Sequence, residues 1–165
     1  MKKVFQEFLF NHPHPNSGDI MAITTSVICN SFKKELFEGT HNFKQSGGNS
    51  FKLSLYTNSA VLGKSTTSFT TDAQVSNSGQ YASGGGALVN GGTSLSTNTA
   101  IVDFADRSFT GVTLTARGAL IYNDTASGDP AVCVLDFGGD KTATSGTFTI
   151  QFPAFTASAA ILRVT

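Results

Sequence analysis

The side chains that most often move protons in enzymes lie near the start of this chain. Three histidines are present, His12, His14 and His41, and no glutamate follows Glu38. Because histidine is the usual proton shuttle at neutral pH, a Ser-His-Asp or Cys-His site in the rest of the chain would have to use one of these three rings. We therefore expect the long C-terminal portion to hold no such site.

Aspartates offer another route to acid–base chemistry, because two carboxyl groups can hydrolyse a glycosidic bond. The candidate pairs are Asp103 with Asp106 and Asp136 with Asp140. Each pair lies at the end of an expected strand beside residues typical of turns, where aspartate commonly caps the backbone. Turn capping is the preferred interpretation, so we predict no catalytic residue and no enzymatic activity.

Motifs for cofactors and zinc are incomplete. Residues 63–65, Gly-Lys-Ser, are like the end of a phosphate-binding loop, but that motif requires glycine at position 58, which is Asn58. Four side chains could bind zinc, but their spacing matches no known zinc motif; they are those of His12, His14, His41 and Cys29. We predict no cofactor.

Four aspartates in the C-terminal half raise the question of calcium, which prefers oxygen ligands. They are Asp124, Asp129, Asp136 and Asp140. The spacing of an EF-hand is absent, and the competing interpretation is that they are solvated loop acids. We predict no metal site.

Two arginines and one glycine-rich segment are candidates for binding. Arg107 and Arg117 stand in a region with few other charges, and each is expected to pair with Asp103, Asp106 or Asp136, inside the domain or across a subunit boundary. The polar segment 72–97 is a flexible connector, a contact surface, or a tip loop that binds a glycan. Its glycines, Gly84 and Gly85 among them, suit a bulge or a mobile loop.

The elements that must position these residues are strands. In 147–152 the apolar Phe148, Ile150 and Phe152 alternate with Thr and Gln, as in a half-buried strand. Similar runs, separated by turn residues, lie at 51–56, 100–105, 111–116, 117–123, 131–137, 146–152 and 159–164, with weaker ones near 68–70 and 86–89. The pattern predicts an antiparallel β-sandwich or jelly-roll-like domain over 21–165, with about eight to nine strands.

One short helix is expected at 26–38, near the N-terminus. Ile28, Phe32 and Leu36 recur at helical spacing, and Cys29 and Phe37 flank this stripe. A hydroxyl residue is available as N-cap, and glycine at position 39 is a typical stop signal. The helix is short, so we expect it to depend on packing against the sheet.

Composition excludes several classes of partner. The 165 residues carry no net charge, so general attraction to nucleic acid or to anionic lipid is not expected. No run of about 18 apolar residues is present, which argues against a membrane span. Two cysteines, Cys29 and Cys133, do not form a disulfide framework, and 14 phenylalanines with no tryptophan must supply much of the core.

Residues 1–20 are expected to be a non-native N-terminal extension. Met21 begins a second plausible start, and Gly18-Asp19-Ile20 before it can be encoded by a purine-rich sequence of the kind that bacterial ribosomes require. The alternative is a native flexible arm that reaches a neighbouring subunit. Within residues 1–10 four apolar side chains fall on one helical face, those of Val4, Phe5, Phe8 and Leu9, and an irregular run with two prolines follows.

The chain from Met21 onward resembles a family of small structural proteins of tailed bacteriophages, common in phages of aquatic bacteria. The resemblance is carried by MAITTSVICNSFKKELFEGTHNF, GNSFKLSLYT, VDFADRSFTGVTLTARGALIYN, AVCVLDFGGDKTATSGTFTIQFP and AAILRV, and it covers about 21–165. It implies a virion structural protein without a catalytic motif. Such proteins decorate the head or form part of the tail.

Two functions are therefore expected. The first is a capsid decoration, or cement, protein that ties major capsid subunits together, with helix 26–38 or its flanks as the docking element and Phe32 and Leu36 as candidate contact residues. The second is a tail or fibre component that binds a host surface glycan through 72–97. Both imply location in the virion after synthesis in the bacterial cytoplasm, contacts with other virion proteins and a homo-oligomer, with no nucleic acid or membrane partner.

Overall fold

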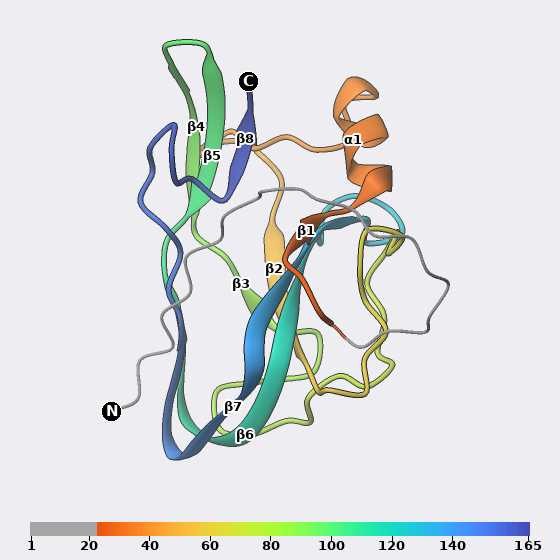
Figure 1. The fold of residues 1–165 in the computed structure, drawn as a ribbon, viewed down its shortest axis with the longest axis vertical. Coiled ribbons are helices and arrows are strands. Elements are labelled where there is room, and N and C mark those ends of the chain that lie inside the picture. Colours follow the sequence, from red (N-terminus) through yellow and green to blue (C-terminus); the bar gives the residue numbers. More distant parts are fainter. Residues whose placement is uncertain (1–22) are drawn as a thin grey trace.

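A computed structural model describes residues 23–165. This part of the chain is mainly β, as predicted, with one short helix near its N-terminal end (Figure 1). The expected extension 1–20 and the second start at Met21 lie outside the described residues. The elements, in chain order, are β1 (Val27–Ile28), α1 (Asn30–Phe37), β2 (Phe51–Tyr56), β3 (Gly86–Ala87), β4 (Asn90–Ser96), β5 (Thr99–Phe104), β6 (Arg107–Asn123), β7 (Ala131–Ile150) and β8 (Leu162–Val164).

Two antiparallel sheets pack together. The larger has the order β1-β7-β6-β2-β3, and the smaller has the order β4-β5-β8. Side chains from both sheets meet in a single hydrophobic core, for example Phe51 from the large sheet and Phe104 and Leu162 from the small one. The sandwich expected from the alternating strands is confirmed.

A long hairpin of β6 and β7 forms the centre of the large sheet. The sequence predicts four separate strands here, but two continuous strands of 17 and 20 residues are found. Gly138 and Gly139, predicted as a turn, lie inside β7 with positive φ angles of 68° and 156°. The pairing register shifts at several points, and such bulges bend a hairpin without ending it. Figure 1 shows both strands curving at the lower end and continuing upward on the other side.

The predicted helix 26–38 is too long at its N-terminal end. Val27 and Ile28 instead form β1, which pairs with Val134 and Cys133 of β7. β-branched residues favour such pairing over a helical start. Cys29 then adopts an extended conformation as N-cap, so α1 begins at Asn30. The glycine at position 39, with φ of 71°, ends the helix region as expected.

Strand β4 was not predicted, because its sequence NGGTSLS has few residues that favour strands. It pairs with β5 in antiparallel register and is held by that partner rather than by its own propensity.

Two buried residues anchor the loop that precedes β4: Val75, and Tyr81, whose hydroxyl accepts a hydrogen bond from Leu55 N at 2.9 Å. The weak strand expected near 68–70 is only an isolated bridge between Ser68 and Pro130.

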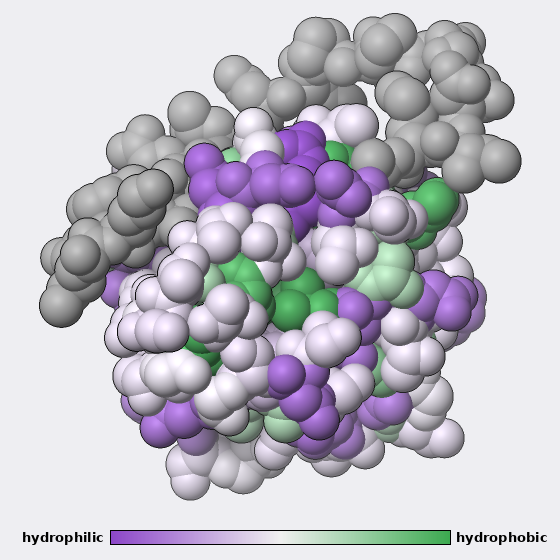
Figure 2. Space-filling view, turned by 90° about the horizontal axis from the view of Figure 1, so that it is seen from below, coloured by the Kyte–Doolittle hydropathy of each residue, from purple (hydrophilic) through white to green (hydrophobic). Residues whose placement is uncertain are grey.

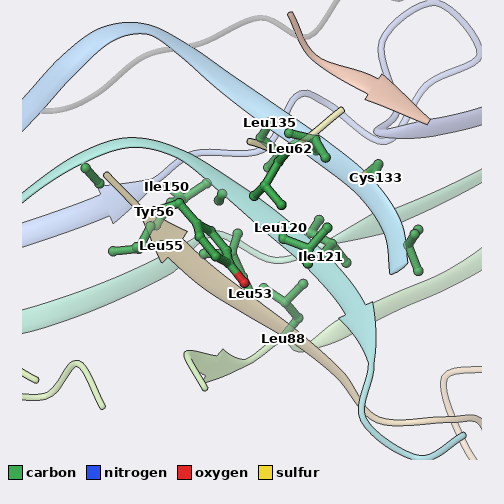
Figure 3. Close-up of a cluster of buried hydrophobic side chains, with 14 of the residues drawn as sticks. Leu53, Leu55, Tyr56, Leu62, Leu88, Leu120, Ile121, Cys133, Leu135 and Ile150 are labelled. Carbon is green, nitrogen blue, oxygen red and sulfur yellow. The ribbon is translucent and has the colours of Figure 1, made fainter. Parts of the chain in front are cut away.

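The core combines aliphatic and aromatic layers. Figure 3 shows Leu53 of β2 with Leu120 and Ile121 of β6 in the aliphatic part. Phe43 and Phe51 stack with ring centroids 4.4 Å apart. No helix within residues 23–165 has the length and apolar character needed to cross a membrane.

Candidate interaction surfaces

His41 lies in a buried polar junction between α1 and the sheet. Its Nε2 is 2.8 Å from Glu35 Oε2, and its Nδ1 is 3.2 Å from Asn123 Nδ2. Because Asn123 Oδ1 accepts hydrogen bonds from the backbone N–H groups of Thr125 and Ala126, the amide nitrogen must face the ring. His41 Nδ1 is therefore the acceptor, and Nε2 carries the proton that is donated to Glu35.

This arrangement makes His41 a structural residue. Both ring nitrogens are engaged, and the ring packs against Phe32 with centroids 4.8 Å apart. The junction holds the helix against the sheet and leaves the imidazole no nitrogen with which to act as a base.

Arg117 forms an ion pair inside the domain. Its Nη2 is 3.3 Å from Asp136 Oδ1, and its Nε donates a hydrogen bond to Ile23 O at 3.1 Å. Asp136 Oδ1 also accepts a hydrogen bond from Gly138 N at 2.8 Å, which fixes the bulge in β7. Of the two expected alternatives, the pair within the domain is the one observed.

Arg107 is different, because neither Asp103 nor Asp106 forms an ion pair with it, nor does any other carboxylate within residues 23–165. Its guanidinium carbon instead lies 4.8 Å from the centre of the Phe109 ring. The Nε atom is buried without a hydrogen-bond partner in this part of the chain. A Cβ at Gly86 would collide with the guanidinium, so this glycine makes room for the arginine.

The glycines predicted as binding residues have backbone roles. Gly84 and Gly85 have positive φ angles of 93° and 82°, which favour glycine. Gly84 O accepts a hydrogen bond from the Tyr122 hydroxyl at 2.6 Å. A Cβ at Gly85 would overlap the carbonyl oxygen of Leu53. These contacts fix the loop against the large sheet.

Asp103 is a buried acid in the small sheet, with only 4 % of its surface exposed. Burial raises the pKa of its carboxyl from 3.8 to about 6; the hydrogen bond from Phe104 N opposes this rise, and the nearby charge of Asp106 adds to it. Within residues 23–165, no group of three or more His, Cys, Asp or Glu side chains that could hold a metal ion is found.

The predicted helical contact residues separate into one buried and one exposed position. Phe32 is 3 % exposed and belongs to the core, so in this structure it cannot reach a partner. Leu36 is 37 % exposed, and Phe37, which the sequence placed at the flank of the buried stripe, is 96 % exposed. An almost fully exposed phenylalanine on a helix fixed by Phe32 is the clearest candidate contact on α1.

Segment 72–97 contains a shallow polar hollow of about 460 Å³. Gln74 lies in it and is fixed by hydrogen bonds with Ser54 and Ser83. Its lining is Thr71, Gln74, Val75, Ser76, Asn77 and Ser83. The hollow offers hydroxyl and amide groups but no aromatic ring or charge.

Three of the exposed apolar side chains belong to elements that Figure 1 places toward one end of the long axis, namely α1, the β4–β5 hairpin and β8. They are Phe37, Leu95 at 72 % and Val164 at 62 % exposure. Figure 2 views the opposite end, where residues of intermediate hydropathy predominate and hydrophobic areas are small. Neither Leu95 nor Val164 was among the contact residues predicted from the sequence; for Leu95 the available signal was the lack of any charged residue in 73–102.

Comparison of the chain with protein-family models, curated proteins and solved structures finds no match.

Proposed function

We propose that this protein is a non-enzymatic structural component of a tailed-phage virion, and specifically a capsid decoration protein. It would bind the outer lattice through α1 and tie neighbouring major capsid subunits together. Its location would be the virion, after synthesis in the bacterial cytoplasm, and its partners would be capsid proteins and further copies of itself. The sequence resemblance over 21–165 motivates the proposal.

The observation that carries the proposal is the exposed Phe37 on an anchored helix. Phe32 and His41 fix α1 to the sandwich, so Phe37 and Leu36 are presented by a rigid element rather than by a loop. A rigid apolar contact loses little conformational entropy when it docks on another protein. Such preorganisation suits a protein that must hold a lattice together.

Several polar side chains hold the fold together, and this also supports a role as a structural protein. The His41 ring, the Arg117 guanidinium and the Asp136 carboxyl are all used in contacts that hold elements in place. A decoration protein needs shape and hydrogen bonds more than reactive groups.

Binding to undecorated phage heads tests the proposal. Wild-type protein should sediment with the heads in a saturable manner. The variant Phe37→Ser should bind about tenfold or more weakly, because burial of a phenylalanine side chain contributes ~1.5–3 kcal/mol.

The matched control is Val89→Ser, which removes a side chain of 68 % exposure outside α1 and should leave binding unchanged. Failure of the wild-type protein to bind heads would contradict the decoration role. Equal loss in both variants would contradict the assignment of α1 as the docking element.

The polar hollow favours a second candidate, a tail or fibre component that binds a host glycan through 72–97. Its hydroxyl and amide groups could hydrogen-bond to sugar hydroxyls. Binding to a glycan array that is abolished by Ser76→Trp, which would fill the hollow, would support this candidate. Absence of glycan binding by the wild-type protein would count against it.

A further inference from the structure

Among residues 23–165, the outer edge of the small sheet has no further strand beside it. Strand β4 is the terminal strand in the order β4-β5-β8, and in this part of the chain only β5 pairs with it. The N-terminal end of β4 contacts other residues of the domain. Asn90 Nδ2 donates a hydrogen bond to Phe43 O, and Gly92 is buried beside Gln45. Beyond Gly92, residues 93–96 are exposed or partly exposed, and within residues 23–165 no second strand or loop pairs with their backbone.

This edge lacks the features that usually prevent one sheet from joining another. Proteins commonly protect edge strands with lysine, proline or inward-pointing charges. No charged residue and no proline occurs in 73–102, which includes all of β4 and the β4–β5 turn. Two copies could therefore approach along this edge without opposing like charges, and the net charge of zero adds no long-range repulsion.

One face of the small sheet carries an exposed apolar row that reaches this edge. Leu95 of β4 lies opposite Ala100 of β5, and Ala100 lies opposite Val164 of β8. Residues opposite one another in a sheet point to the same face. Leu95 and Val164 are 72 % and 62 % exposed, so the row is unburied at both ends.

We propose that β4 pairs with β4 of a second copy about a two-fold axis at Leu95. Antiparallel pairing centred there joins the two small sheets into one six-stranded sheet. It also brings the two Leu95 side chains together, so that two short rows become one continuous apolar row. A surface that is apolar, uncharged and open along its edge is complementary to itself, as a two-fold contact requires.

The geometry favours this pairing over a head-to-tail contact. The other edge strand of the small sheet, β8, has three residues, so it offers a ladder of similar length, but only pairing of β4 with itself brings two Leu95 side chains together. The β4 contact is itself small compared with a standard protein interface of about 1,600 Å², so we expect weak association in dilute solution and stronger association at high local concentration. The inference depends on the edge alone and not on the virion assignment.

Disulfide trapping tests the contact directly. In Leu95→Cys the two introduced thiols should face each other across the two-fold axis, where cross-strand Cβ atoms lie about 4.5–5.5 Å apart. Mild oxidation should convert Leu95→Cys to a covalent dimer much faster than the control Val61→Cys. The control site is also exposed, at 60 %. The native Cys29 and Cys133 are buried and should not interfere.

Sedimentation of the reduced proteins provides a measurement that does not depend on the exact register. The wild-type protein should dimerise as its concentration rises. Leu95→Lys should raise the dissociation constant of the dimer by at least about tenfold, because it places two cations together. The control Val61→Lys should dimerise like the wild type. A wild-type protein that stays monomeric at its solubility limit and shows no preferential Leu95→Cys crosslink would overturn the proposal. Dimerisation unaffected by Leu95→Lys would overturn it as well.

Discussion

The substitution Asp103→Asn should stabilise the protein near neutral pH and lose this advantage in acid. Asp103 is a carboxyl with 4 % exposure and no ion-pair partner among residues 23–165. Burial raises its pKa from 3.8 to about 6, so the folded protein binds this proton more tightly than the unfolded chain does. Asparagine has nearly the same shape, has no charge and can keep the hydrogen bond from Phe104 N.

The direction and size follow from the linkage between protonation and folding. Stability from the protonated carboxyl is complete below about pH 3.8 and is lost as the pH rises through about 6. One pKa unit corresponds to about 1.4 kcal/mol, so ionised Asp103 lowers the free energy of unfolding by up to about 3 kcal/mol at neutral pH. Asp103→Asn removes this pH-dependent loss.

Urea unfolding of both proteins between about pH 4 and pH 7.5 measures the effect. The difference in free energy of unfolding, variant minus wild type, should increase by about 1–3 kcal/mol across this range. Every other titrating group is common to both proteins and cancels in the comparison, apart from its interaction with Asp103. A difference that stays constant with pH would refute the argument.

Other substitutions test the packing. Phe32→Ala should lower the free energy of unfolding by about 3–5 kcal/mol in urea, since it opens a cavity beneath α1; a loss below about 1 kcal/mol would mean that α1 is not anchored there. Tyr81→Phe should cost about 1–3 kcal/mol, because Leu55 N loses its buried acceptor, and an unchanged midpoint would argue against that bond. Gly85→Ala should be strongly destabilising through overlap with Leu53 O, and wild-type thermal stability in this variant would show that the loop is not held so closely.

The fold class could be predicted because the core strands alternate clearly. Strand β2 was predicted with its observed bounds, since Phe51, Leu53 and Leu55 point inward between polar residues. The continuity of β6 and β7 could not be predicted, because a glycine-rich bulge and a turn have the same local composition. Pairing with the neighbouring strand decides between them, and that information is not local.

The candidate surfaces were less predictable than the fold. Helical spacing cannot show how far round α1 the sheet reaches, so the sequence placed Phe32 and Leu36 together while the structure buries the first and exposes the second. Arg117 was correctly given Asp136 as a possible partner, but the packing of Arg107 on Phe109 was not expected, because no strand was predicted over 107–109 to bring the two side chains to one face. Strand β4 depends on β5 for its formation, so its open edge is visible only in the structure.

A three-dimensional map of the native phage particle tests the central claim most directly. The decoration role predicts density for this sandwich at repeated positions on the outer capsid surface, with α1 and Phe37 against the major capsid protein. Density confined to the tail, or absence of the protein from the particle, would contradict it.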